Sequence, residues 1–215
     1  MENVYIFLAA LAAYLVGSVP TSIWIGKLFY GIDIREYGSG NAGTTNTFRV
    51  LGKKAGIPVF FIDVLKAYIP AKFVVFFPYL IAGTSDYVNL QLLFGGMAVV
   101  GHIFPIYAKF RGGKGVASLL GVAFAIAPEA AIVAFVVFAW TLIITKYVSL
   151  SSLMAGFSFP IMVILVGKTT IVSLMFFSIL LSVLLVLTHK KNIERLLKRE
   201  ESKAYIFKRK NKNSD

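Results

Sequence analysis

Long stretches without a charged side chain constrain the fold of this 215-residue chain more than any other feature. No charged residue occurs within residues 3–26, 147–167 or 169–188. Each stretch approaches the roughly 20 residues that an α-helix needs to cross a bilayer. Backbone amides in lipid need partners within the chain, and the alternating segments of a membrane barrel are missing, so we expect helices. The sequence therefore predicts an all-α polytopic membrane protein.

Seven apolar segments are expected to cross the membrane within one catalytic domain, residues 1–189, followed by a basic tail, residues 190–215. They cover residues 3–29, 56–82, 87–108, 115–127, 129–146, 150–167 and 169–188. Asp63 and Lys66 interrupt the second segment on one helical face, which predicts an ion pair. The fourth and fifth segments meet at Pro128, where we expect a tight hairpin. The first segment is too long for a cleaved signal peptide and follows Glu2, so we expect a retained span.

Positive charge gathers in the connections that seven crossings would place on one side of the membrane. The basic residues are Arg35, Arg49, Lys53 and Lys54 after the first segment, Lys109, Arg111 and Lys114 before the fourth, and Lys190, Lys191, Arg195, Lys198, Arg199, Lys203, Lys208, Arg209, Lys210 and Lys212 in the tail. The opposite connections carry mainly Asp86, Glu129 and Lys168. Because cytoplasmic loops are rich in Lys and Arg, we predict an outside N-terminus, a cytoplasmic C-terminus and a cell (inner) membrane location. The tail is expected to bind anionic lipid headgroups.

The first basic connection combines three glycines with polar side chains. Its members are Gly38, Ser39, Gly40, Asn41, Gly43, Thr44, Thr45, Asn46 and Arg49. Glycine lets backbone N–H groups approach an anion closely, and a guanidinium suits phosphate. The spacing also resembles the approach to a helix start, where phosphate gains from the helix dipole. We interpret this segment as a phosphate-binding loop; the alternative is an ordinary polar loop.

The second basic connection contains Arg111-Gly-Gly-Lys-Gly115 directly before an apolar segment. It predicts a second phosphate cradle at a helix N-terminus. The spacing differs from that of a Walker A loop and no strand precedes it, which argues against a nucleotide triphosphatase. Lys109 and Arg111 could serve only as positive-inside anchors, but anchoring does not need the three glycines around Lys114.

Further polar residues are predicted on the same face. Ser149 to Ser152 begin the sixth segment, where the alternative role is a helix N-cap. His189 ends the last segment, where the alternative is a cap favoured by the helix dipole. His102 lies at the end of a segment, where it could hydrogen-bond to a neighbouring helix.

These stretches together resemble the bacterial acyl-phosphate:glycerol-3-phosphate acyltransferases, integral membrane enzymes of phospholipid synthesis. The resemblance rests on Gly17-Ser-Val-Pro20, on Gly38 to Asn46 with Arg49 and Gly52, on Gly101-His-Ile-Phe-Pro105, on Phe110 to Ala117, on Val148 to Ser152, and on His189 with Asn192. The chain departs from the family at Ser22 and Ala67, where glycine is usual. The resemblance implies seven helices with an outside N-terminus. It also implies acyl transfer from acyl phosphate to the 1-hydroxyl of glycerol 3-phosphate, giving lysophosphatidic acid and phosphate.

The resemblance also implies roles for individual residues. Ser39, Arg49, Lys114 and His189 would be catalytic and, with Ser152 and Asn192, would surround glycerol 3-phosphate. The hole for the acyl phosphate head would comprise Asn41, Gly43, Thr45, Asn46, Gly112, Gly113, Lys114 and Gly115. The acyl chain would lie between helices and enter from the lipid.

The chemistry needs no cofactor, because acyl phosphate is already activated and neither ATP nor coenzyme A is required. The chain has no Cys, which excludes thiol nucleophiles, and we expect no metal and no nucleic-acid partner; a monomer satisfies the pattern. The His-Asp pair of other glycerolipid acyltransferases is missing, since Tyr107 stands five residues after His102. His189 has Glu194 at that spacing, a coincidence expected in a basic tail helix. Our hypothesis is that an oxygen of the donor phosphate takes the proton, with His189 as a reserve base.

Two other classes of protein fit parts of the pattern. A transporter for a phosphorylated anion would explain the basic loops, but transporters usually show repeated halves, and this sequence has none. A lipid-surface adaptor would explain residues 190–212 but leaves the glycine loops without a role.

Overall fold

The computed structural model describes residues 1–167 and 169–204, and these residues form only helices and connecting loops. Lys168 and the basic residues from Lys208 onward lie outside the described part of the chain. The α-helices are α1 (Glu2–Gly17), α2 (Thr21–Tyr30), α3 (Thr44–Leu51), α4 (Lys53–Ala71), α5 (Ser85–Ile103), α6 (Val116–Ile126), α7 (Pro128–Thr145), α8 (Val148–Leu165), α9 (Val172–Thr188) and α10 (Lys190–Leu197). Short 3-10 helices are η1 (Ile34–Glu36), η2 (Lys72–Phe76) and η3 (Ile106–Ala108).

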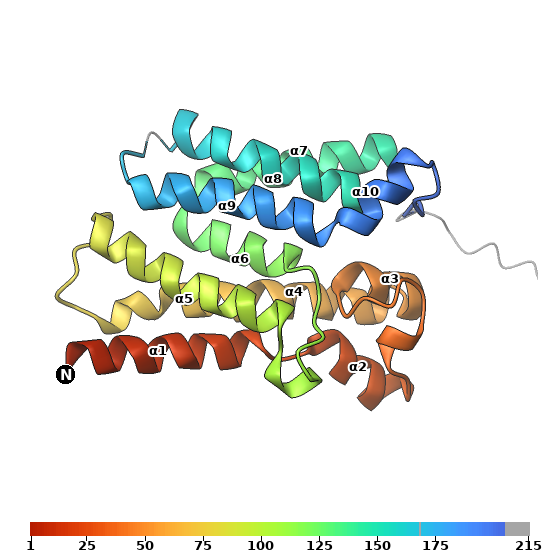
Figure 1. Cartoon of the computed structure of the whole chain (residues 1–215), viewed down its shortest axis with the longest axis horizontal. Helices are drawn as coiled ribbons and strands as arrows, with labels where there is room; N and C mark the ends of the chain where they lie inside the picture. Colours follow the sequence, from red (N-terminus) through yellow and green to blue (C-terminus); the bar gives the residue numbers. More distant parts are fainter. Residues whose placement is uncertain (168, 205–215) are drawn as a thin grey trace, which may run out of the picture.

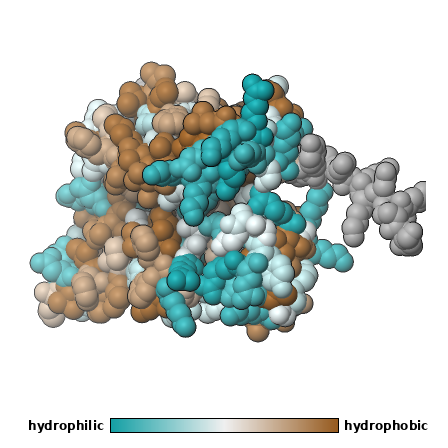
Figure 2. Space-filling view, turned by 45° about the vertical axis from the view of Figure 1, so that its right-hand side comes forward, coloured by the Kyte–Doolittle hydropathy of each residue, from teal (hydrophilic) through white to brown (hydrophobic). Residues whose placement is uncertain are grey.

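The long helices lie roughly side by side in one bundle (Figure 1). Helix α1 packs on α5 and α4, α4 packs on α6, and α8 packs on both α7 and α9. The short helices α2, α3 and α10 gather at one end of the bundle, and the N-terminus of α1 lies at the other (Figure 1). Figure 2 shows most of the hydrophilic side chains of the visible face gathered toward the end that carries these short helices, with mostly brown apolar surface and a few hydrophilic side chains over the rest. The bundle is therefore polar at one end and apolar along its length.

The apolar helices make the chain an integral membrane protein with several spans. Within the described residues, three segments are long and apolar enough to cross a membrane, namely Ser85–Ala108, α7 and α8. The number rises to five if α1 with α2, bent by 40°, and α9 with α10, bent by 63°, each count as one span. Helix α6 has only 11 residues, and α4 carries four charged side chains. Length and composition thus account for three to five of the seven expected crossings.

Several expected segments differ from the helices in detail. The expected first segment, residues 3–29, is two helices, because Pro20 precedes α2 and cannot donate a backbone hydrogen bond. The expected second segment, residues 56–82, ends as an α-helix at Ala71 and continues only as η2. The expected hairpin at Pro128 is confirmed, since Ala127 alone separates α6 from α7. The expected helix start in the first basic connection is confirmed by α3 at Thr44.

Two glycines allow the close approach of α1 and α5. A Cβ atom on Gly17 would lie 2.1 Å from the carbonyl oxygen of Ala98, and one on Gly101 would lie 2.3 Å from that of Tyr14. Small residues at helix contacts are the usual way for membrane helices to bring their backbones together. This contact fixes the end of α5 from which the second basic connection departs.

We expect Gly101→Ala to lower the free energy of unfolding by roughly 1–3 kcal/mol, because the added methyl group must displace backbone atoms of α1. Gly96→Ala is the matched control in the same helix, since a Cβ atom there meets nothing within 4 Å. The measurement is the thermal unfolding of both variants in detergent. Equal stability of the two variants would contradict the packing explanation.

Candidate active site

Asn46 organises the first glycine loop from the first turn of α3. Its side-chain nitrogen donates to the carbonyl oxygens of Ile34 and Tyr37, both at 3.0 Å, and its side-chain oxygen accepts the N–H of Ser39 at 2.9 Å. Only 1% of Asn46 is exposed. The amide therefore closes the loop around itself, which leaves the exposed side chain of Ser39 facing outward.

The N-terminus of α3 presents a possible anion site next to this loop. Gly43 caps the helix, and the first-turn N–H groups of a helix lack acceptors within it. A Cβ atom on Gly43 would lie 2.9 Å from the side-chain nitrogen of Asn41, so glycine keeps this corner open. Thr45 is exposed in the first turn. The arrangement suits a phosphate that accepts hydrogen bonds from N–H groups and polar side chains.

The second glycine loop is held by backbone hydrogen bonds to α5. Its N–H groups at Gly112 and Gly113 donate to the carbonyl oxygens of Ile103 (3.1 Å) and His102 (3.2 Å). These bonds hold the loop along the last turn of α5, whose carbonyls lack donors within the helix, and the binding of a phosphate by this loop stays a prediction. A Cβ atom on Gly112 would lie 2.0 Å from the oxygen of His102, so glycine is needed here for packing. Gly115 caps α6 with φ at +82°.

A buried ion pair lies beneath both loops. Lys66 Nζ is 2.8 Å from Asp63 Oδ1, as the spacing predicts, and donates to the carbonyl oxygen of Val19 at 2.7 Å. Thr44 donates to Asp63 Oδ2 at 3.4 Å, which ties the start of α3 to α4. The hydrogen bond expected from His102 to a neighbouring helix is not formed at Nδ1, which lies 3.8 Å from Asp63 Oδ1 and has no partner among the described residues. The ion pair thus supports the loops from below.

The second loop carries Lys114 to a polar cluster built from the other end of the sequence. Lys114 Nζ donates to Asn192 Oδ1 of α10. Asn192 Nδ2 donates to Glu201 Oε1 at 2.6 Å, and Glu201 also accepts hydrogen bonds from Ser149 and Arg195. The sequence pattern indicates Lys114 and Asn192 but contains no signal for Glu201, which lies among basic residues of the tail.

Other predicted residues lie around this cluster. Arg49 of α3 donates to Ser202 Oγ at 2.7 Å, so the first loop region reaches the same tail segment. Ser39, Asn41 and Thr45 belong to the first loop and make no hydrogen bond to Lys114 among the described residues. The structure therefore joins Arg49, Lys114 and Asn192 through hydrogen bonds of the tail, whereas Ser39 and Asn41 lie in the loop before α3 and Thr45 lies in its first turn.

Burial lowers the pKa of Lys114 to about 8, a shift that Glu201 opposes and that Arg195 and Arg49 reinforce. The ammonium group is therefore still mostly charged at neutral pH, but less securely than an exposed lysine. A partly desolvated cation interacts strongly with an incoming phosphate.

His189 is a neutral ring at the end of α9. Burial, and after it the charge of Lys114, lower its pKa to about 4. Its Nδ1 lies 2.8 Å from the carbonyl oxygen of Leu185, which can only accept a hydrogen bond. Nδ1 therefore carries the proton, and Nε2 is left as the acceptor. The sequence leaves open that His189 is a charged cap favoured by the helix dipole. A buried, neutral ring disagrees with that alternative.

The serines at the start of α8 do not act as an N-cap. Tyr147 occupies the cap position, and no side chain caps the helix. Ser149 donates to Glu201 Oε1 at 2.8 Å, whereas Ser152 donates to the carbonyl oxygen of Val148 at 2.9 Å. The cluster of serines instead forms the wall of the polar site nearest to the bundle core.

An apolar cavity of about 90 Å³ begins at this wall and runs between α6, α7, α8 and α9. Its lining includes Ser152, Gly156, Leu119, Phe159 and Leu185. A Cβ atom on Gly156 would lie 2.4 Å from a methyl carbon of Leu185, so glycine keeps these helices close and the cavity narrow. The space has the character required by a hydrocarbon chain.

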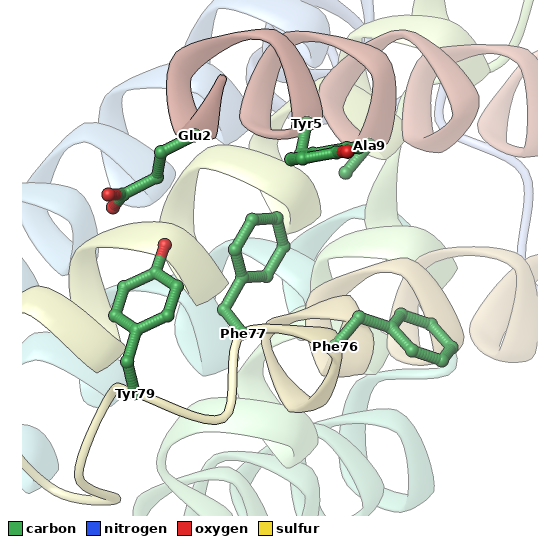
Figure 3. Close-up of a pocket in the computed structure, with 6 residues that line it drawn as sticks. All are labelled: Glu2, Tyr5, Ala9, Phe76, Phe77 and Tyr79. Atoms are coloured by element: carbon green, nitrogen blue, oxygen red, sulfur yellow. The ribbon is translucent and has the colours of Figure 1, made fainter.

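A larger cavity, of about 430 Å³, lies far from this cluster. Its lining is Glu2, Tyr5, Ala9, Phe76, Phe77 and Tyr79, at the N-terminal end of α1 (Figure 3). Its charged group is a carboxylate, and no Lys or Arg lines it. Of these two cavities, the smaller one is the one that reaches a serine of α8 near the Lys114 cluster.

Comparison with known proteins shows the family of this chain. The glycerol-3-phosphate acyltransferase family model matches residues 7–199. The glycerol-3-phosphate acyltransferase of Staphylococcus carnosus is 42% identical over 199 residues, covering 92% of this chain and 97% of that protein. Glycerol-3-phosphate acyltransferase 2 of Bacillus anthracis is 41% identical over 196 residues, covering 91% and 97%.

Solved structures give the same result for the fold. The crystal structure of PlsY (YgiH), an integral membrane glycerol 3-phosphate acyltransferase, in its glycerol 3-phosphate form has a TM-score of 0.83 and 36% identity, covering 93% of this chain and 96% of that one. Its lysophosphatidic acid form gives a TM-score of 0.80 and 35% identity, covering 94% and 96%. The chain belongs to the glycerol-3-phosphate acyltransferase family.

Proposed function

We propose that this protein transfers a fatty acyl group from acyl phosphate to the 1-hydroxyl of glycerol 3-phosphate, producing lysophosphatidic acid and phosphate. One observation supports this most strongly: the cationic cluster around Lys114 adjoins an apolar cavity at the serines of α8. Such a junction suits a reaction between a water-soluble phosphate ester and an activated lipid. Membership of the family supports the same acceptor and product.

The two phosphates would occupy neighbouring parts of the site. Glycerol 3-phosphate would bind among Ser39, Arg49, Lys114, Ser152, His189 and Asn192. The acyl phosphate head would lie at the N-termini of α3 and α6, contacting Asn41, Gly43, Thr45, Lys114 and Gly115. Asn46, Gly112 and Gly113 act by shaping these loops, since their polar groups already have internal partners. The acyl chain would extend into the apolar cavity.

The reaction is a displacement at the acyl carbon. The hydroxyl oxygen forms a bond to this carbon, and the bond from the carbon to the phosphate oxygen breaks. Phosphate leaves and takes the hydroxyl proton on one of its own oxygens. Arg49 and Lys114 hold the reactants together and stabilise the developing negative charge. Nε2 of His189, the acceptor nitrogen of a neutral ring, orients the hydroxyl.

The membrane arrangement that fits this function has seven crossings of the cell (inner) membrane, with the N-terminus outside. Helices α4 and α6 would complete the set, since the ion pair between Asp63 and Lys66 offsets the cost of charge in α4. The loops, α10 and the C-terminus would face the cytoplasm, where glycerol 3-phosphate is dissolved. We retain residues 1–189 as the catalytic domain and 190–215 as a basic tail for anionic headgroups. Within this tail, Asn192 and Glu201 would form part of the site, a role supported by the hydrogen bonds that link them to Lys114.

In detergent, without a sealed compartment, the purified protein should release phosphate from acyl phosphate only when glycerol 3-phosphate is added. Acyl-CoA should not replace the donor, because the proposed chemistry needs a leaving phosphate. The measurement is phosphate release together with detection of lysophosphatidic acid. Binding of glycerol 3-phosphate without turnover would indicate a transporter instead.

We expect Lys114→Ala to lower kcat/KM by roughly 10²–10³-fold, because the variant loses a partly buried cation that stabilises charge in the transition state. The matched control is Lys191→Ala, which removes the same charge from an exposed position beside Asn192. Steady-state kinetics with both substrates distinguish the two variants. Wild-type kinetics for Lys114→Ala would remove the basis for the phosphate site.

We expect His189→Ala to lower kcat by less than about 10²-fold at saturating substrates, which is the lower limit of the usual contribution of a general base. The reason is that the donor phosphate takes the proton in the proposed reaction. Single-turnover kinetics, combined with a binding measurement for glycerol 3-phosphate, test this. A loss of several orders of magnitude in the chemical step with intact binding would assign the proton to His189.

A further inference from the structure

The segment that follows α10 returns into the polar site. Arg199 adopts a left-handed conformation with φ at +60°, and the N–H of Glu200 donates to the carbonyl oxygen of Arg195 at 2.8 Å. The N–H of Ala204 then donates to the carbonyl oxygen of Lys146 at 2.8 Å. This turn carries Glu201 inward between α8 and α10, with 5% of its side chain exposed.

The carboxylate of Glu201 accepts hydrogen bonds from two helices and has both of its oxygens occupied. Oε1 accepts from Asn192 at 2.6 Å and from Ser149 at 2.8 Å, and Oε2 accepts from Arg195 at 2.7 Å. Burial alone would raise the pKa of Glu201, but hydrogen bonds from Arg195, Asn192 and Ser149 outweigh it and lower this pKa. Glu201 is therefore ionised at neutral pH.

This contact determines how the amide of Asn192 is oriented. A carboxylate can only accept hydrogen bonds, so it selects the nitrogen of the amide, and the oxygen must point the other way. That oxygen accepts the hydrogen bond of Lys114. Glu201 and Lys114 thus hold the amide in the same orientation, because one accepts from its nitrogen and the other donates to its oxygen, and loss of Glu201 removes half of this restraint.

A carboxylate in a phosphate site would repel the substrate unless its charge were balanced. Arg195 balances it directly, at 2.7 Å. Within residues 1–167 and 169–204, neither Lys114 nor Arg49 lies within ion-pair distance of a carboxylate. Both cations thus stay available to a phosphate while Glu201 and Arg195 neutralise each other.

We propose that Glu201 is a positioning residue that orients Asn192 and Lys114 for the phosphate of glycerol 3-phosphate. The proposal rests on the proposed function and adds to it a residue of the tail. The neighbouring Ser202 accepts a 2.7 Å hydrogen bond from Arg49. The segment that contains Glu201 and Ser202 thus joins α3, α8 and α10 around the site proposed for glycerol 3-phosphate.

The test compares Glu201→Ala with Glu200→Ala, which removes the same charge from an exposed neighbour. We expect Glu201→Ala to raise the KM for glycerol 3-phosphate by about 10- to 100-fold, the range expected for loss of charged hydrogen bonds, with a smaller rise in the KM for acyl phosphate, because that substrate shares Lys114 but not Asn192. Glu200→Ala should match the wild type. Thermal unfolding in detergent identifies a variant that is merely unfolded, and Glu201→Gln, which keeps the shape, should give an intermediate KM.

The pH dependence of the activity is a second measurement, and a general loss of folded protein would not shift it. The groups that face Lys114 are Glu201, which favours its charged form, and Arg195 and Arg49, which oppose it; His189 is neutral. Lys114 is charged below its pKa, so activity should fall as the pH rises through about 8. In Glu201→Gln the fall in activity at alkaline pH should occur at a lower pH. Glu201 would no longer favour the charged form of Lys114, whereas Arg195 and Arg49 would still disfavour it.

Two results would overturn the proposal while leaving the proposed function intact. One is wild-type KM values and an unshifted fall in activity at alkaline pH in both Glu201 variants. The other is a lower KM for glycerol 3-phosphate in Glu201→Ala, which would show that the carboxylate competes with the substrate. Failure of the proposed function is distinct, because the wild-type protein itself would then not consume acyl phosphate.

Discussion

The buried ion pair between Asp63 and Lys66 is the interaction on which the functional end of the molecule depends. Both side chains are almost fully buried, at 2% and 6% exposed. Charges in such a position are tolerated only if they are paired and their remaining hydrogen-bonding atoms are used. Lys66 uses its spare donor at Val19, where the chain breaks between α1 and α2, and Thr44 approaches Asp63 from α3. One pair thereby locates three helix ends.

The buried ion pair and the end of α5 together hold the glycine loops in shape. Ser118 of α6 donates to the backbone oxygen of Asp63 at 3.0 Å, so the helix that begins after the second loop is held to the same point. The second loop also uses the free carbonyls at the end of α5. Several of these positions require glycine, because neighbouring backbone or side-chain atoms lie too close to leave room for a Cβ atom. Lys114 is the residue of this loop whose side chain reaches Asn192 and the polar cluster.

The long helices could be predicted from the sequence, because a run of uncharged residues in lipid has few alternatives to a helix. Local chemistry also predicts the Asp63–Lys66 pair and a helix start in the first basic connection, which the structure places at Thr44. The break at Pro20 was not predicted, since a continuous apolar run of residues conceals it. Apolar composition likewise does not reveal where a helix becomes η2.

The site was predictable only in those parts where a local pattern carries the chemistry. Lys114 and Asn192 could be named from their surroundings, but their contact joins residues 78 positions apart. Glu201 was missed because its role depends on a turn after α10 that reverses the chain. Glu201 follows Glu200 in a basic tail, and in the sequence both resemble solvated residues. The burial of Glu201 follows from tertiary structure alone.

Burial and charge have opposing effects in this pocket. Excluding water strengthens the attraction of Lys114 for phosphate, but the same burial lowers the pKa of Lys114 to about 8 and so reduces its charge. A nearby carboxylate restores the charged form, yet it would repel the phosphate if its own charge were free. Pairing Glu201 with Arg195 on one side and with Asn192 on the other meets both requirements. The carboxylate supports the ammonium group through space, while its lone pairs are directed toward neighbouring protein donors.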